Sequence, residues 1–290
     1  MREFVLATDS SCDLPQELVD KFELTVVPLT VNINGNAFKN YLDGREIEFK
    51  EFYNCSRAKA EITTSCPSLA AFTSAFTEIL EEGKDILYIG FSSALSATTQ
   101  NATIVAEELR GVYPEAKIIV VDSLAASMGQ GLLIKYVYEE KQKGKTIEEV
   151  AQYAEDTKLH ICHWFTVDDL MYLKRGGRIS ATTAIAGTAL NVKPVMHTDD
   201  EGRLTNVGKA RGRKASLHAL LEQMKETAIN PKEQTIYISH GDCEDEVKNF
   251  AKQIKKEVGF KEVVINYVGP VIGGHTGPGV VALFFYGTKR

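Results

Sequence analysis

The chain has 290 residues with a formal net charge of −6, and this length allows two domains of about 150 residues each. The acidic balance argues against nucleic acid as the main partner, because binding to a phosphate backbone needs a basic face. The longest apolar stretch, residues 280–286, is far shorter than the roughly 20 residues of a membrane-spanning helix, so we expect no membrane insertion.

Short apolar runs alternate with segments of helical periodicity in the first half of the chain. The expected strands span residues 4–7, 24–31, 86–89 and 118–121, and Asn34-Gly35 marks a tight turn. The expected helices span 16–22, 96–109, 124–141 and 146–159, with two more around Phe49, Phe52 and Tyr53 and around Phe72, Phe76, Ile79 and Leu80. This alternation predicts a mainly parallel sheet covered by helices on both faces.

The second half continues as α/β but includes a pair of adjacent strands. The expected strands span 160–167, 195–198, 204–208, 235–239, 263–268 and 280–286, and the expected helices span 169–174, 182–192, 215–226 and 246–258. A tight turn falls at residues 175–178, Arg-Gly-Gly-Arg. We place a domain boundary near residue 160, with an N-terminal α/β domain at 1–160 and a second α/β domain with a mixed sheet at 161–290.

Residues 269–279 read Gly-Pro-Val-Ile-Gly-Gly-His-Thr-Gly-Pro-Gly. Glycine supplies backbone shapes that other residues avoid and proline fixes φ, so this composition predicts one defined loop. The loop would carry His275 and Thr276 between the last two strands, where a backbone rich in glycine lets a small ligand approach. Because loops on rigid scaffolds often carry function, we interpret it as part of a site.

Small hydroxyl residues gather where strands of the expected parallel sheet end. Thr64 and Ser65 precede a helix, and residues 92–96 read Ser-Ser-Ala-Leu-Ser. Asp13 and Ser123 fit the simpler role of helix N-caps. The other hydroxyls exceed what capping requires, and a helix N-terminus favours anions, so we interpret them as a cradle for a carboxylate or phosphate.

Four motifs together resemble the DegV family, from the first strand to the last. They are Thr-Ser-Cys-Pro-Ser at 64–68, Ser-Ser-Ala-Leu-Ser-Ala-Thr at 92–98, Leu-Lys-Arg-Gly-Gly-Arg-Ile at 173–179 and Gly-Gly-His-Thr-Gly-Pro-Gly at 273–279. The resemblance implies a two-domain DegV-like fold that binds a long-chain fatty acid, such as palmitate or oleate, between its domains. It also implies a carrier that is not itself an enzyme and presents the carboxylate to a separate fatty acid kinase.

The resemblance further implies which residues act on the ligand. Thr64 and Ser96 would hold the acyl carboxylate with His275 close by, and Arg178 would assist phosphate transfer or kinase docking. The wider expected ligand set adds Ser65, Ser93, Gly273 and Thr276. The chain departs from the usual pattern of the family at two positions. Cys66 stands where the family usually has Gln, and Ala97 stands where it usually has Gly.

The physical chemistry of the chain suits a lipid ligand. Burying an acyl chain of about 16 carbons at about 0.8 kcal/mol per CH₂ offers on the order of 10 kcal/mol before ordering costs. Hydroxyls and an imidazole can then satisfy the head group. The expected helix 182–192, with Ile185, Leu190 and Val192, is a candidate wall of the acyl tunnel.

The main alternative is a serine hydrolase. Ser92 stands on a strand-to-helix turn, and Ser92, Asp122 and His275 follow the order Ser, Asp, His. The neighbouring hydroxyls Ser93 and Ser96 fit an anion cradle better than a single exposed nucleophile, so we favour the carrier.

Other sites have weaker support. A metal site built from His160, Cys162 and His163 is rejected, because strand alternation puts His163 on the opposite face from the other two. The basic segments 174–178 and 209–214 lack interleaved aromatic residues, which favours a surface facing protein or phosphate, or a solvated helix start, over RNA. The five cysteines show no paired spacing, which predicts a cytoplasmic protein, and no cofactor or metal is expected.

Overall fold

The first strand lies inside a four-stranded parallel sheet, as the alternating pattern predicts. The computed structural model describes residues 2–180, 191–288 and 290. The strand order is β2-β1-β6-β7, and every neighbouring pair is parallel. These strands are β1 Phe4–Asp9, β2 Thr25–Val27, β6 Asp85–Gly90 and β7 Ile118–Asp122.

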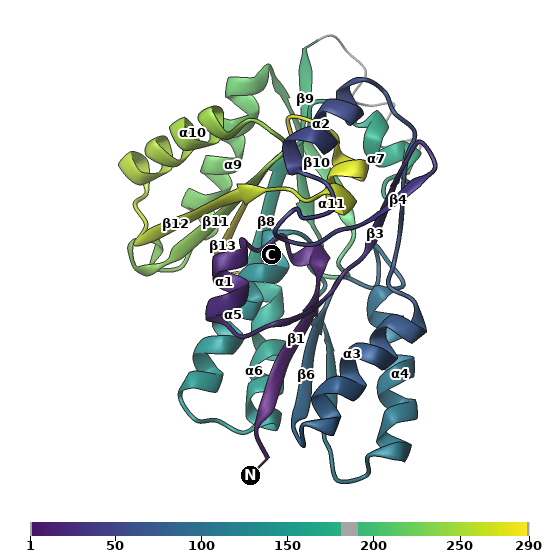
Figure 1. The fold of residues 1–290 in the computed structure, drawn as a ribbon. Coiled ribbons are helices and arrows are strands. Elements are labelled where there is room, and N and C mark those ends of the chain that lie inside the picture. Colours follow the sequence, from purple (N-terminus) through teal and green to yellow (C-terminus); the bar gives the residue numbers. More distant parts are fainter. Residues whose placement is uncertain (1, 181–190, 289) are drawn as a thin grey trace.

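Helices cover both faces of this sheet (Figure 1). All of β6 is buried because its alternate side chains enter different layers. Ile86 and Tyr88 pack with α3 Leu69–Glu81 and α4 Thr98–Val112. Leu87 and Ile89 pack on the side of α5 Met128–Gln142 and α6 Ile147–Thr157. The predicted capping box of α6 is present, with Thr146 and Glu149 each accepting from the other's backbone N–H.

A second, six-stranded sheet follows residue 160, in the order β10-β9-β8-β13-β11-β12. Only β11 and β12 pair in parallel; the other neighbouring strands of this sheet are antiparallel, so it is mixed as expected. The strands are β8 Ile161–Thr166, β9 Val192–Thr198, β10 Leu204–Arg211, β11 Thr235–His240, β12 Glu262–Tyr267 and β13 Val281–Tyr286. One face carries α9 Arg213–Thr227 and α10 Glu244–Glu257 (Figure 1).

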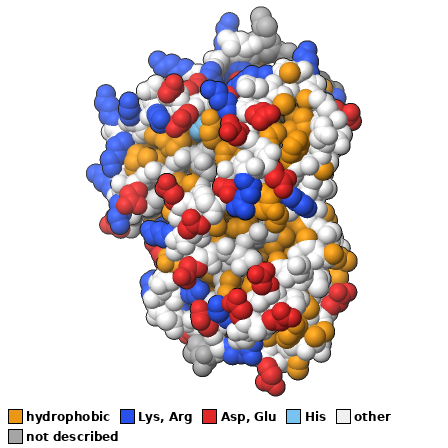
Figure 2. Space-filling view, in the orientation of Figure 1, with side chains coloured by type: hydrophobic (Ala, Val, Ile, Leu, Met, Phe, Trp, Pro, Cys, Tyr) orange, Lys and Arg blue, Asp and Glu red, His pale blue; other side chains and the backbone are white. Residues whose placement is uncertain are grey.

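The opposite face of the mixed sheet turns toward α5, which therefore contributes to both halves. One core cluster joins Leu87 of the parallel sheet, Leu132 of α5 and Phe284 of β13. Hydrophobic side chains also reach the surface between the upper and lower halves, and the exposed lysines of α10 gather at the upper left (Figure 2). The domain boundary near residue 160 stays a prediction.

A small antiparallel sheet of order β4-β3-β5 was not expected. It contains β3 Thr30–Ile33, β4 Asn36–Lys39 and β5 Ile62–Ser65, beside α2 Phe49–Arg57. The segment predicted as one strand, 24–31, divides between β2 and β3, because the chain leaves the parallel sheet after Val27. Pro28, which cannot donate to a ladder, stands at the break. The predicted turn at Asn34-Gly35 is confirmed, with φ of 50° and 84°.

The remaining elements are short. They are α1 Gln16–Lys21, α7 Met171–Arg175, α11 Pro270–Thr276 and the 3₁₀ turns Ser10–Cys12, Lys158–His160 and Pro231–Glu233. The expected tunnel helix 182–192, with Ile185 and Leu190, lies outside the described residues except at its end, where Val192 begins β9. Within the described part of the chain, no helix is both long and apolar enough to cross a bilayer.

Candidate ligand-binding site

The segment predicted as a loop at 269–279 forms the helix α11 instead. Pro270 occupies its first turn, and Gly277 ends it at a φ of 75°. Gly273 packs against α2, because a Cβ there would lie 2.7 Å from a ring carbon of Phe52 and 2.8 Å from the hydroxyl of Tyr53. Gly273 therefore permits helix packing and does not line the cavity described below.

His275, near the end of α11, meets Thr64 of β5. Its Nε2 lies 2.7 Å from Thr64 Oγ1, within hydrogen-bond distance. Its Nδ1 is buried and has no hydrogen-bond partner among the described residues. A Cβ on Gly176 would lie 2.0 Å from that Nδ1, so the first glycine of the Arg-Gly-Gly-Arg turn lets the imidazole take this position.

Burial, with a smaller contribution from Arg178, lowers the pKa of His275 to about 4. The imidazole is therefore neutral at pH 7 and acts as a hydrogen-bonding group without a charge. When Nε2 carries the proton, it donates to Thr64 Oγ1 and leaves the hydroxyl hydrogen of Thr64 available to a ligand.

The side chain of Arg178 turns inward. Its Nε donates to the carbonyl of Leu95 at 3.2 Å, and its guanidinium also donates to the carbonyl of Gly176. The side chain is half-buried and lines the same cavity as His275. Among the described lining residues it is the one permanent cation, which suits it to an anionic head group.

The cavity beside these residues is mainly apolar. It offers about 90 Å³ to the centre of a water molecule, well above the roughly 10–15 Å³ that one water needs. Its apolar lining comes from both halves and includes Leu29, Phe91, Leu95, Phe165, Leu173, Leu204, Val268, Val271, Ile272, Val280, Ala282 and Phe284. An apolar cavity with a few polar groups is typical of a site for a largely hydrophobic ligand.

Most of the predicted site residues meet here. Thr64, Ser65, Ser96, His275, Thr276 and Arg178 all line the cavity. Ser96 Oγ also lies 2.8 Å from Thr98 Oγ1, at the start of α4. Ser93 is exposed and does not line the cavity, and its backbone N–H donates to Asp122 at 3.3 Å.

Asp13 has a different role from the helix cap that was predicted. Pro15 occupies the N-cap position of α1, whereas Asp13 Oδ1 accepts from the N–H of Gly269 at 3.0 Å, at the start of α11. Asp13 Oδ2 accepts from Ser127 Oγ at 2.5 Å, and Ser127 lines the cavity. Burial raises the pKa of Asp13 to about 8. No local pattern in the sequence indicates partners so distant along the chain.

Ser123 is not a helix cap either. Its Oγ accepts from the N–H of Ala125 at 3.1 Å, and α5 begins only at Met128. This hydroxyl therefore stabilises the turn that leads into the helix.

The residues of the hydrolase alternative have other partners. Ser92 Oγ is buried and donates to the carbonyl of Gly202 at 2.9 Å. Asp122 accepts from the N–H of Leu124 at 3.0 Å, and His275 pairs with Thr64. Within the described residues no hydrogen bond joins Ser92, Asp122 and His275, so the geometry does not favour this alternative.

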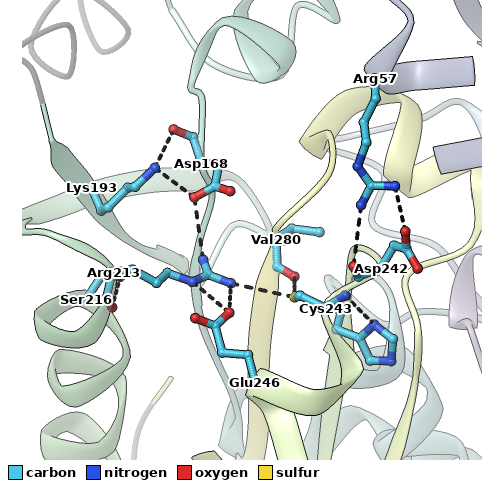
Figure 3. Close-up of polar contacts among 10 residues, drawn as sticks. Arg57, Asp168, Lys193, Arg213, Ser216, Asp242, Cys243, Glu246 and Val280 are labelled. Atoms are coloured by element: carbon cyan, nitrogen blue, oxygen red, sulfur yellow. Dashed lines mark hydrogen bonds and ion pairs between the residues drawn. The ribbon is translucent and has the colours of Figure 1, made fainter. Parts of the chain in front are cut away.

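Arg213, from the basic segment 209–214, is engaged in ion pairs (Figure 3). Its guanidinium donates to Glu246 at 2.6 Å and lies 3.9 Å from Asp168, which also pairs with Lys193 at 2.7 Å. These contacts join the start of α9 to α10 and to the end of β8. The charge of Arg213 is therefore paired within the chain and is not available to bind a partner molecule.

Metal ligands do not cluster in the part of the chain that the structure describes. No group of three or more His, Cys, Asp or Glu there has the arrangement to hold an ion. His160, one of the residues weighed for such a site, has its Nδ1 2.9 Å from the carbonyl of Gly287.

Comparisons with known proteins agree with this architecture. The family model described as "Uncharacterised protein, DegV family" matches residues 3–288. A DegV domain-containing protein of Clostridium perfringens is 42% identical over 290 residues, 100% of this chain and 99% of that protein. A DegV family protein of Thermus thermophilus, whose solved structure is described as showing fatty acid binding, is similar at 35% identity and a TM-score of 0.89, over 99% of this chain and 100% of that one.

A second solved structure, of a stearic acid-binding protein from Eubacterium ventriosum, is similar at 27% identity and a TM-score of 0.88, over 97% of each chain. The expected fold, a parallel sheet followed by a mixed sheet, is confirmed.

Proposed function

The chain belongs to the DegV family, and we propose that it binds one long-chain fatty acid, such as palmitate or oleate, in its apolar cavity. The observation that carries this proposal is the Thr64–His275 pair at the edge of a cavity lined mainly by hydrocarbon. The tail supplies affinity through burial of apolar surface. The fatty-acid-binding relatives of similar fold support the same ligand class.

The head group would lie among Thr64, Ser96, His275 and Arg178. A buried carboxylate needs donors, and the hydroxyls of Thr64 and Ser96 can supply them. The half-buried guanidinium of Arg178 would offset its charge. Ser65 and Thr276, which also line the cavity, complete the proposed ligand set.

The proposal also includes presentation of the bound ligand to a second protein. A carrier would present the carboxylate to a partner fatty acid kinase in the cytoplasm, with no cofactor and no catalytic activity of its own. Phosphate transfer to a carboxylate needs charge neutralisation around the transferring group, and Arg178 is suited to provide it. His275, fixed by Thr64 and by the neighbouring Gly176, would orient the carboxylate.

Comparing an acid with its alcohol tests the head-group assignment. We expect Thr64→Val to weaken palmitate binding about ten- to a hundredfold while changing binding of hexadecanol much less, because a lost hydrogen bond to a charged group costs about 1.5–3 kcal/mol. Thr63→Val is the matched control, since Thr63 neighbours Thr64 on β5 but is exposed and does not line the cavity. Equal losses for acid and alcohol would show that Thr64 does not face the head group.

A further inference from the structure

A buried carboxyl group lies directly behind the cavity wall. Asp13, in the loop after β1, is only 2% exposed and does not line the cavity. Its Oδ2 lies 2.5 Å from Ser127 Oγ, and its Oδ1 lies 3.0 Å from the backbone N of Gly269. Ser127 lines the cavity, and so does Val268, which precedes Gly269. One layer of residues therefore separates this carboxyl group from the space that a ligand would occupy.

The surroundings of Asp13 favour the neutral carboxyl group over the carboxylate. Among the described residues no cation pairs with it, and the buried carboxyl group of Asp9 acts against its ionisation. Asp13 accepts from one hydroxyl and one backbone N–H, whereas Asp9 accepts from two backbone N–H groups, two hydroxyls and one amide. Burial, together with Asp9, raises the pKa of Asp13 to about 8, so this carboxyl group keeps its proton at pH 7.

Two other titratable side chains interact electrostatically with Asp13. Cys12 precedes it in the chain, and Tyr53 belongs to α2. Burial raises the pKa of both well above their ordinary values, so both are neutral at neutral and mildly alkaline pH. The contacts from α5 and from the start of α11 bring no charge. Among these described neighbours, Asp13 is therefore the group that changes charge as the solution becomes mildly alkaline.

Ionisation of Asp13 adds a charge without removing its contact to α11. The backbone N–H of Gly269 can donate to Oδ1 in either state. His275 lies six residues further along the helix, which is about 9 Å at 1.5 Å per residue. The head-group residues proposed above therefore begin within roughly 10 Å of Asp13. At that distance and an effective dielectric constant of about 20, repulsion between two like charges changes a binding constant about tenfold.

We propose that binding of the fatty acid carboxylate is linked to a proton on Asp13, so that the protein holds its anionic ligand more tightly while Asp13 is neutral. This inference rests on the proposed binding of fatty acids. Because such linkage is reciprocal, the bound carboxylate in turn strengthens the hold of Asp13 on its proton. Binding at mildly alkaline pH therefore takes up a proton from solution.

The first test compares palmitate affinity at pH 7 and at pH 9.5. For wild type we expect about five- to tenfold weaker binding at pH 9.5, because Asp13 is then ionised in the free protein. Hexadecanol carries no charge, so its affinity should change much less over the same range. Asp13→Asn cannot ionise, and it should bind palmitate at pH 9.5 nearly as tightly as at pH 7.

Two control variants distinguish Asp13 from another buried acid and from a thiol of the cavity. Asp85→Asn removes a carboxyl group that is 3% exposed at the start of β6, whereas the cavity-lining Phe91 follows the end of that strand. Cys66→Ser removes a thiol that lines the cavity, because thiols ordinarily titrate at about pH 8.5. Both variants should keep the wild-type ratio of palmitate affinities at the two pH values. Loss of the pH dependence in either variant would assign it to that group and overturn the inference.

Proton uptake by wild type gives a second, independent measurement. Calorimetric titration with palmitate in buffers of different ionisation enthalpy should show about half a proton taken up per ligand at pH 8.5 and about a tenth at pH 7. These values follow from a pKa of about 8 and a tenfold coupling. If Asp13→Asn does not fold, the hexadecanol comparison and this uptake still decide the question.

Three results would overturn the inference alone. They are equal palmitate affinities of wild type at the two pH values, an equal loss of affinity for hexadecanol, and an undiminished loss for palmitate in Asp13→Asn. Absence of proton uptake at pH 8.5 would do the same. Failure of wild type to bind palmitate at pH 7 would contradict the proposed function and this inference with it.

Discussion

Replacing Gly176 with alanine tests whether the imidazole of His275 must lie where the structure places it. Gly176 has a φ of −71°, which suits alanine, so the backbone does not oppose the change. The new Cβ would lie 2.0 Å from His275 Nδ1, whereas ordinary contact begins at 3.4 Å. The ring must therefore move by about 1.4 Å, the difference between those distances.

The new Cβ would press on Nδ1, whereas Thr64 lies 2.7 Å from Nε2 on the other side of the ring. A ring pushed straight away from Gly176 would be driven into Thr64, so the imidazole must leave this position and the Thr64 contact is lost. Losing one hydrogen bond costs about 0.5–1.5 kcal/mol, and overpacking adds about 1–3 kcal/mol to the loss of stability. We expect Gly176→Ala to bind palmitate about tenfold more weakly, since each 1.4 kcal/mol is a factor of ten.

Gly177→Ala is the matched control. Gly177 has nothing within 4 Å of a Cβ but a φ of 73°, so alanine there strains the backbone without touching His275. Both variants should lose some thermal stability, by differential scanning fluorimetry, while only Gly176→Ala should lose affinity in displacement of a fluorescent fatty acid. The reasoning is refuted if Gly176→Ala binds palmitate like wild type, or if Gly177→Ala loses as much.

Three further outcomes are expected. Arg178→Ala should weaken palmitate binding, because its guanidinium offsets the carboxylate charge, and should also sharply slow acyl-phosphate formation at saturating palmitate, measured with radiolabelled ATP and a cognate kinase; unchanged turnover would remove its proposed role in transfer. The folded-state pKa of Asp13, about 8, exceeds the ordinary value of about 3.9, so between these pH values the folded protein keeps a proton that the unfolded chain has lost. The free energy of unfolding therefore falls as pH rises from about 3.9 to about 8. Asp13→Asn should therefore show a smaller fall in Tm between pH 6.5 and 8 than wild type, and parallel curves would contradict this. Ser92 should not react with a fluorophosphonate probe, because its Oγ is buried and donates to Gly202; stoichiometric labelling there would restore the hydrolase alternative.

Local patterns predicted the regular part of the fold. Alternating apolar runs located β1, β6 and β7, because a strand buried on both faces leaves a continuous apolar segment in the sequence. The capping box of α6 and the Asn34-Gly35 turn depend only on neighbouring residues, and both are confirmed.

The parts that the sequence missed depend on distant contacts. Four glycines within or next to residues 270–276 disfavour a helix on propensity alone, yet α11 forms. Asp13 binds the N–H at its start, and Phe52 and Tyr53 pack where Gly273 has no side chain. Such contacts join residues more than 200 positions apart, and no local sequence pattern predicts them.

The candidate site was predicted more from the resemblance than from the residues. Thr64, Ser96 and His275 do line one cavity, whereas Ser93 and Gly273 do not. A run of hydroxyls cannot show which of its members faces inward, because that depends on how the turn before α4 packs.

Native mass spectrometry of the protein purified from a bacterial host tests the central claim most directly. A cavity lined by hydrocarbon and open to the lipids of the cell should fill, so we expect the chain mass plus the mass of one fatty acid, with the acid recovered by extraction. The bare chain mass alone, together with no binding of added palmitate or oleate and no rise in Tm, would contradict the account.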